Sequence, residues 1–185
     1  MPLTRALQRA DLADETRRRL LCAREALDAR ATDQLVTLLS GDADPFVCEA
    51  TLTGLARLEG DFPIDALVKL ICVEDPALRN AAIETLGYLG ERAIDSIERR
   101  LADDDPHRRI YALNALEGTD SRRAAAIALR VALADRHVNV CAAAVDVVAR
   151  CGGPDIAAEL RTAAARFPEH PFFNVAVRAA LQEIG

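Results

Sequence analysis

Aromatic side chains are scarce in this 185-residue chain: they make up 4% of it, and Trp is absent. Apolar runs are short, and none approaches the roughly 18 residues that a membrane-spanning helix needs. Residues 1–5 contain no apolar segment of the kind that directs secretion. These absences predict a soluble, cytoplasmic protein that does not bind a membrane.

Basic residues are fewer than acidic ones. The chain has 23 Lys and Arg residues against 29 Asp and Glu residues, which leaves a formal net charge of -6. Nucleic-acid backbones and anionic lipid surfaces attract clustered Lys and Arg side chains. We therefore expect neither a nucleic acid nor an anionic membrane as the partner.

Cysteine and histidine occur without the spacing of a metal site. The five cysteines include no C-x-x-C pair, so we expect reduced, buried thiols rather than disulfides or zinc ligands. His107, His137 and His170 are interpreted as helix caps or groove residues. Because the chain also lacks a G-x-S-x-G motif and a Gly-rich phosphate loop, we expect no catalytic residue, no metal and no cofactor.

What the chain does contain is a repeat. The dipeptide Asp-Pro, followed after nine residues by Leu, begins at Asp44, Asp75 and Asp105, and weaker copies begin at His137 and His170. A period of about 30 residues is the signature of a solenoid of helical repeats. Each repeat is predicted to form a helix, a short acidic turn and a second helix, because its apolar residues recur at helical spacing.

The repeats divide the chain into a cap and five units. Residues 1–31 lack the repeat but have helical periodicity, so we expect capping helices that cover the apolar edge of the first repeat. The repeats are placed, within one continuous domain covering residues 32–185, at about 32–60, 61–90, 91–120, 121–152 and 153–185.

Residues 75–90, DPALRNAAIETLGYLG, resemble the bacterial HEAT-like pattern D-P-x-V-R-x-x-A-x-x-A-L-G-x-L-G. The resemblance extends over residues 32–185 and implies an all-α fold, a right-handed, armadillo-type αα solenoid of about five HEAT-like hairpins. In this family the repeat Asp and the Arg four residues later tend to join neighbouring repeats. Arg79 and Arg109 match that Arg, whereas the other three repeats have Cys48, Cys141 and Asn174.

Repeats of this kind present surfaces, so we interpret the chain as a non-catalytic protein–protein interaction scaffold or adaptor. The second helices usually line the concave surface of a solenoid. Both tyrosines fall there, and exposed aromatics are typical of binding hot spots; for Tyr111, filling a gap between helices is an equal alternative. The predicted partner-binding row is Glu84, Tyr88, His107, Ile110, Tyr111, Asn114, Asp146 and Arg150.

Two catalytic activities of HEAT-type proteins depend on features that this chain lacks. The chain has no His-Glu dipeptide of the kind found in enzymes similar to deoxyhypusine hydroxylase, and no Trp or basic balance suited to DNA-base excision. The repeats are also similar in style to HEAT-type phycobilin lyase subunits. A lyase-like chaperone for a bilin chromophore or a client protein therefore stays open as the alternative function.

The last helix predicts an association edge. Its inward stripe is expected to contain Phe173, Val177, Leu181 and Ile184. A second apolar row faces elsewhere, and contiguous apolar surface usually marks an association site. We therefore expect a second copy of the chain or the partner itself to cover this edge, unless Phe172 folds under the turn before the helix. The edge residues are Phe172, Val175 and Ala179.

Overall fold

The computed structural model describes residues 2–41 and 44–185; Met1 of the predicted cap, Asp42 and Ala43 lie outside them. The chain divides into two compact units, Met1–Tyr88 and Leu89–Gly185, which are described separately. Every regular element among the described residues is a helix, so the prediction of an all-α fold of helical hairpins is confirmed. That the repeats form one continuous domain stays a prediction.

The first unit contains two capping helices and two hairpins. Its helices are α1 (Pro2–Leu7), α2 (Asp14–Asp28), α3 (Thr32–Ser40), α4 (Pro45–Ala56), α5 (Asp61–Leu70) and α6 (Pro76–Leu89, the last residue of which falls in the second unit). The first helices of the two hairpins, α3 and α5, pack side by side. Helices α1 and α2 fall within residues 1–31, and α3 to α6 fall within residues 32–90.

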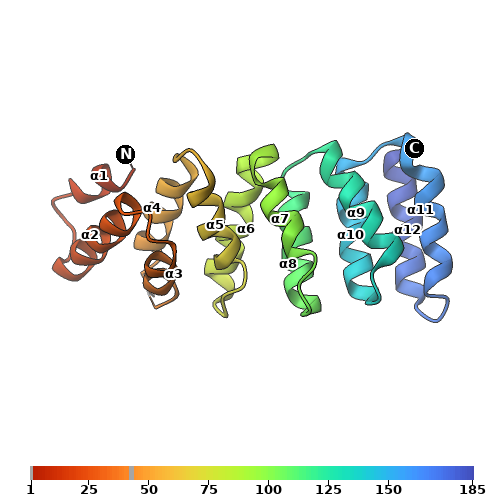
Figure 1. Ribbon diagram of the computed structural model, residues 1–185, viewed down its shortest axis with the longest axis horizontal. Coiled ribbons are helices and arrows are strands. Elements are labelled where there is room, and N and C mark those ends of the chain that lie inside the picture. The colour runs from red at the N-terminus through yellow and green to blue at the C-terminus, as the bar shows by residue number, and fades with distance from the viewer. Residues whose placement is uncertain (1, 42–43) are drawn as a thin grey trace. The chain divides into compact units, whose positions relative to one another are not determined.

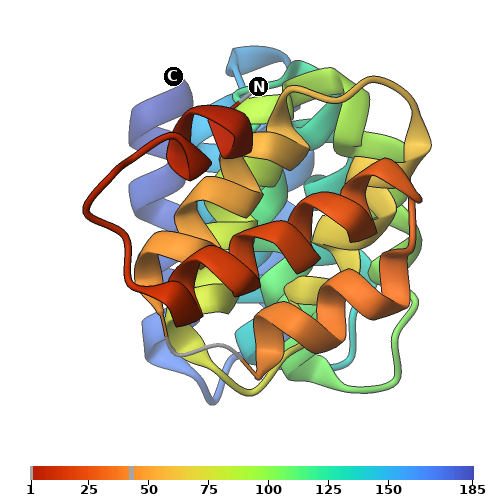
Figure 2. The same cartoon turned by 90° about the vertical axis from the view of Figure 1, so that its left-hand side faces the viewer.

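Figure 2 shows α1 and α2, in red, lying across the end of this unit, over α3 and α4. Leu3 of α1 and Leu27 of α2 are buried there. A Cβ atom at Gly54 of α4 would lie 3.3 Å from a methyl carbon of each of these leucines. The absence of a side chain at Gly54 therefore lets both capping helices approach α4 closely.

The Asp-Pro repeat marks where second helices begin. The Asp44 carboxylate accepts a hydrogen bond from the Phe46 amide (3.0 Å), and Asp105 accepts one from the His107 amide (2.9 Å). Proline fits the first helical position, where its missing N–H is not needed. His137 and His170 hold the same position in the last two repeats, but neither side chain caps its helix.

The second unit contains three hairpins. Short 3₁₀ turns precede or follow two of the first helices: Gly90–Ala93 (η1), Pro154–Ile156 (η2) and Ala164–Arg166 (η3). Its helices are α7 (Ile94–Arg100), α8 (Pro106–Glu117), α9 (Arg122–Ala134), α10 (Val138–Cys151), α11 (Ala157–Ala163) and α12 (Pro171–Ile184). Helix α10 packs against α8, α9 and α12 (Figure 1). Its residues Val140, Ala144, Val145 and Val148 are buried.

Two arginines bind the turns of the second unit. Arg109 donates to the carbonyls of Asp103 and Asp104 ahead of its own helix, and two of its nitrogens contact the Asp135 carboxylate of the next repeat at 2.8 and 2.9 Å. Cys141 replaces the repeat Arg in that next repeat. There Arg166 donates to the carbonyls of Ala132 (2.7 Å) and Asp135 (2.6 Å).

Exposed ion pairs join neighbouring first helices within each unit. Lys69 of α5 contacts Asp33 of α3 at 2.6 Å. Arg130 of α9 contacts Glu98 of α7 at 2.6 Å, and Arg123 of α9 pairs with Asp95 of α7. Pairs this exposed contribute little stability, because water screens them.

Among the described residues, no helix is both long and apolar enough to cross a bilayer.

Candidate functional site

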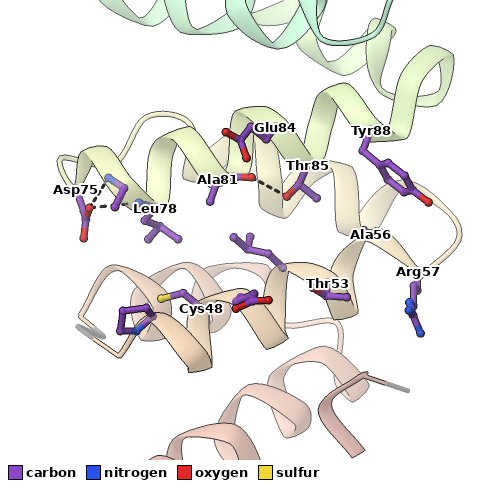
Figure 3. A pocket seen from close by; sticks show the side chains of 14 residues that line it. Cys48, Thr53, Ala56, Arg57, Asp75, Leu78, Ala81, Glu84, Thr85 and Tyr88 are labelled. Carbon is purple, nitrogen blue, oxygen red and sulfur yellow. Dashed lines mark hydrogen bonds between the residues drawn. The ribbon is translucent and has the colours of Figure 1, made fainter. Parts of the chain in front are cut away.

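A groove runs between α4 and α6 in the first unit (Figure 3). Its volume, about 670 Å³, lies in the range of ligand-binding clefts. One wall comes from α4 and the residue after it, and the other from α6 and its cap. The lining residues are Pro45, Cys48, Glu49, Leu52, Thr53, Ala56, Arg57, Asp75, Ala77, Leu78, Ala81, Glu84, Thr85 and Tyr88.

The base of the groove is apolar, and two polar side chains beside it already have hydrogen-bond partners. Leu52 and Leu78 each expose only 4% of their surface, so they form a floor that belongs to the core. The Thr85 hydroxyl donates to the Ala81 carbonyl at 2.7 Å, which satisfies the most buried polar group of the α6 wall. Asp75 is committed to helix capping, because its carboxylate accepts from the amides of Ala77 and Leu78.

Three charged side chains of the groove remain available. Glu49 on α4 and Glu84 on α6 are exposed on facing walls, and Arg57 lies just beyond the end of α4. Within the described residues, no hydrogen bond or ion pair engages these three side chains. Tyr88 lies at the same end as Arg57 and is 83% exposed, so its ring is free to contact a partner (Figure 3).

A second groove, of about 520 Å³, lies on the other side of α4, against α1. Arg5, Arg9 and Arg57 line it together with Phe46 and Glu49, so it is richer in positive charge than the first groove. The Arg9 guanidinium stacks 5.2 Å from the Phe46 ring centroid and pairs with Asp11 at 2.7 Å. The exposed face of α4 therefore separates two grooves of different charge.

In the first unit, both residues of the predicted row, Glu84 and Tyr88, line the α4–α6 groove. The opposite wall, with Glu49, Thr53 and Arg57, was missing from the predicted row. Thr53 and Arg57 follow Asp44 at the same distances at which Glu84 and Tyr88 follow Asp75, so the signal for these two residues was present in the sequence.

In the second unit, the rest of the predicted row lies on α8 and α10. His107 and Asn114 are exposed on α8, where Ile110 and Tyr111 are half-buried. Tyr111 thus contacts its neighbours and also retains accessible surface. On α10, Asp146 and Arg150 are exposed.

The surroundings of Asp146 are acidic. Although the side chain is exposed, nearby protein atoms displace part of its water, and this desolvation raises the pKa of the carboxyl; the charges of Glu117 on α8 and Glu183 on α12 raise it further. Carboxylates from three second helices of this unit therefore act on one another. Such a surface favours cationic groups on a partner.

The predicted association edge on α12 is accessible. Phe172 is 49% exposed and Val175 is 54% exposed, and Ala179 is exposed beside them. Phe172 does not fold under the preceding turn. Its ring makes an edge-to-face contact with His170, with the ring centroids 5.7 Å apart. Phe167 instead packs against the buried Phe173, with centroids 5.2 Å apart.

The inward stripe of α12 differs in one place from the prediction. Ala180 is buried, and Leu181 is half-buried.

All five cysteines are free thiols. Cys141 and Cys151 are buried, and burial is the main cause that raises the pKa of both. The prediction of buried thiols is wrong for Cys22, which is exposed on α2, and Cys48 and Cys72 are only half-buried. Within residues 2–41 and 44–185, no group of three or more His, Cys, Asp or Glu side chains is arranged to hold a metal ion.

Comparisons with known proteins address the fold. Residues 32–117 match a family model described as HEAT repeats. No curated protein matches the chain. Among solved structures, a designed armadillo repeat protein in complex with the peptide (KR)4 is similar at a TM-score of 0.48 and 18% identity, and the match covers 100% of this chain and 99% of that one.

Two engineered proteins solved by a structural genomics consortium are similar at TM-scores of 0.43 and 0.42, each with 17% identity. These matches cover 98% of this chain, and 57% and 94% of the other two chains. The region that matches the family model contains α3 to α8, and helix–turn–helix hairpins continue through α12. The chain thus contains HEAT-like repeats over residues 32–117.

Proposed function

We propose that this chain is a non-catalytic scaffold or adaptor that binds another protein on the surface formed by the second helices of its repeats. The observation that supports this proposal most is the α4–α6 groove. It combines an apolar floor, charged side chains without partners among the described residues, and the exposed ring of Tyr88. Binding hot spots combine these features, because an aromatic ring beside an apolar pocket buries much surface with little loss of rotamer freedom.

The second unit offers related chemistry on its own second helices. Tyr111 and Ile110 provide apolar surface on α8, and Asn114 lies exposed one turn further along the same helix. Asp146 and Arg150 add charge on α10. These side chains give the second unit a partner-binding surface of its own in this proposal.

The proposal is tested by affinity purification with quantitative mass spectrometry. The bait is the full chain as wild type, as Tyr88→Ala/Tyr111→Ala, and as Asp65→Ala/Arg161→Ala. The last variant is a matched control, because it removes two exposed side chains from the first helices α5 and α11 and leaves the net charge unchanged. Loss of hot-spot side chains typically weakens binding by ~10-fold or more.

We expect a specific partner to be recovered with the wild type and the control and to be lost with the tyrosine variant. Equal recovery of every protein with all three baits would overturn the proposed surface. Circular dichroism of each bait shows whether the helices are intact, so a folding defect is not mistaken for lost binding.

We further propose that the protein acts in the cytoplasm and has neither a nucleic acid nor a membrane as its partner. Five free thiols and an acidic net charge of -6 support these assignments, because disulfides accumulate in oxidising compartments and phosphate-rich partners select basic surfaces. Self-association through the edge on α12 is proposed as a second contact, separate from the second-helix surface of the first unit.

A further inference from the structure

The side chains of the α4–α6 groove define the chemistry of its occupant, and this inference rests on the protein-binding role proposed above. We propose that the groove binds a peptide segment of a partner protein in which apolar side chains lie between a cationic side chain and a carboxylate. Each part of this pattern has a counterpart on the groove walls.

The cationic side chain is selected by Glu49 and Glu84. They extend from α4 and α6, the two walls of the groove, and both are exposed. The third carboxylate of the lining, that of Asp75, already accepts two backbone amides. Glu49 and Glu84 place negative charge on both walls of one apolar groove, and a Lys or Arg side chain that enters it is attracted to both.

The apolar part of the segment is selected by the floor. Leu52 and Leu78 present their remaining surface to the groove, and Ala56 and Ala81 leave space above it because their side chains are short. Burying apolar side chains here gains roughly 25 cal/mol for each Å² removed from water. Affinity therefore comes mainly from the apolar side chains of the segment that leave water on entering the groove, and the charges decide which segments fit.

The carboxylate is selected by Arg57. This residue follows the last turn of α4, at the end of the groove where Tyr88 also lies (Figure 3). Arg57 also borders the second groove, beside Arg5 and Arg9, so positive charge gathers at this end. Neither Arg5 nor Arg57 has a carboxylate partner within the described residues.

The spacing of the charges sets the length of the segment. Arg57 lies about two helical turns beyond Glu49, or ~12 Å along the axis of α4. An extended chain covers that distance in about four residues. The segment is therefore short, with its cationic and acidic side chains about four positions apart and apolar residues between them.

Fluorescence anisotropy with the full chain tests the proposal. The probe is a labelled, end-blocked peptide of about seven residues with an apolar centre, a Lys near one end and a Glu about four positions away. Two further peptides replace either the Lys or the Glu by Gln. We expect the Lys/Glu peptide to bind, the loss of Lys to weaken binding about fivefold, and the loss of Glu to weaken it about threefold.

Protein variants assign each preference to its residues. Glu49→Gln/Glu84→Gln is expected to bind the Lys/Glu peptide and the peptide without Lys equally. Arg57→Gln is expected to bind the Lys/Glu peptide and the peptide without Glu equally. The matched control is Glu25→Gln/Asp65→Asn, which neutralises two exposed carboxylates of the same unit outside the groove and should behave as wild type.

The proposal is overturned if the Lys/Glu peptide binds more weakly than about 1 mM, or if the charge variants leave its preferences unchanged. Failure of this inference is distinct from failure of the proposed function. If Tyr88→Ala weakens all three peptides equally while charge has no effect, the groove binds partners but not by this chemistry. If the peptides bind as expected but the affinity purification recovers every protein equally, the groove chemistry stands and the proposed scaffold surface fails.

Discussion

At the scale of the residue, the guanidinium of Arg109 joins two repeats of the second unit. Arg109 is 5% exposed and binds two backbone carbonyls of its own turn as well as the Asp135 carboxylate of the next repeat. Burial alone would raise the pKa of Asp135. The hydrogen bonds from Arg109 and from the His137 amide, with the charge of Arg109, outweigh it, so the pKa lies below its usual value.

Arg109→Met is predicted to destabilise the fold by about 3 kcal/mol, because it leaves a largely buried carboxylate and two carbonyls without their donor. For a chain of this size, that loss lowers Tm by roughly 6 to 12 °C. Thermal unfolding followed by circular dichroism measures the shift. Arg108→Met is the matched control, because Arg108 is 48% exposed and makes only long ion pairs, of 3.6 and 3.8 Å. Similar losses in the two variants would contradict this role of Arg109.

The contribution of the pair depends on pH in a definite direction. Because the pKa of Asp135 is lower in the folded chain than in the unfolded one, the stabilisation is complete above the unfolded value of about 3.9. It is lost as the pH falls through the folded pKa. The difference in Tm between wild type and Arg109→Met is thus expected to be constant near neutral pH and to shrink below about pH 4.

At the scale of the element, much of the structure follows from the sequence. Asp-Pro predicts the starts of α4, α6 and α8, and the spacing of apolar residues predicts their buried faces. The groove could not be predicted, because its volume depends on how far apart α4 and α6 pack. Arg166 was missed for a related reason: it lies outside the repeat offset of the Arg whose place it takes, and only the tertiary fold brings it to Asp135.

Asp105→Ala is predicted to lower stability by about 1 kcal/mol, or Tm by ~2 to 4 °C, because α8 loses its N-cap. The Tm of Asp104→Ala, measured by thermal unfolding in the same way, provides the control. Asp104 is exposed in the same turn, and its contact to Arg109 comes from the backbone carbonyl, so a change of side chain should have little effect. An equal loss in both variants would show that the charge of the turn matters rather than the cap.

At the scale of the whole molecule, the exposed edge on α12 predicts self-association. Phe172 and Val175 present adjacent apolar surface on the last helix, and a two-fold contact would bury the same surface of both copies. Light scattering across a range of concentrations is expected to show a dimer for the wild type and a monomer for Phe172→Asp/Val175→Asp. The control Arg178→Asp/Gln182→Asp places the same new side chains at two exposed polar positions of α12. A wild type that stays monomeric at every concentration would show that this edge does not self-associate.

In the second unit, Arg166 binds a turn whose own repeat has Cys141 in place of the repeat Arg, and this has a consequence for how repeats diverge in sequence. The match to the HEAT family model ends at residue 117, the last residue of α8, which is the last second helix with both the Asp-Pro start and the repeat Arg. The hairpins continue through α12, where Arg166 supplies the guanidinium that position 141 has lost. The sequence of a repeat can thus change until a family model no longer matches it, while a guanidinium from another repeat still forms the hydrogen bonds of its turn. Among homologues, Arg at position 141 is expected where position 166 is no longer Arg.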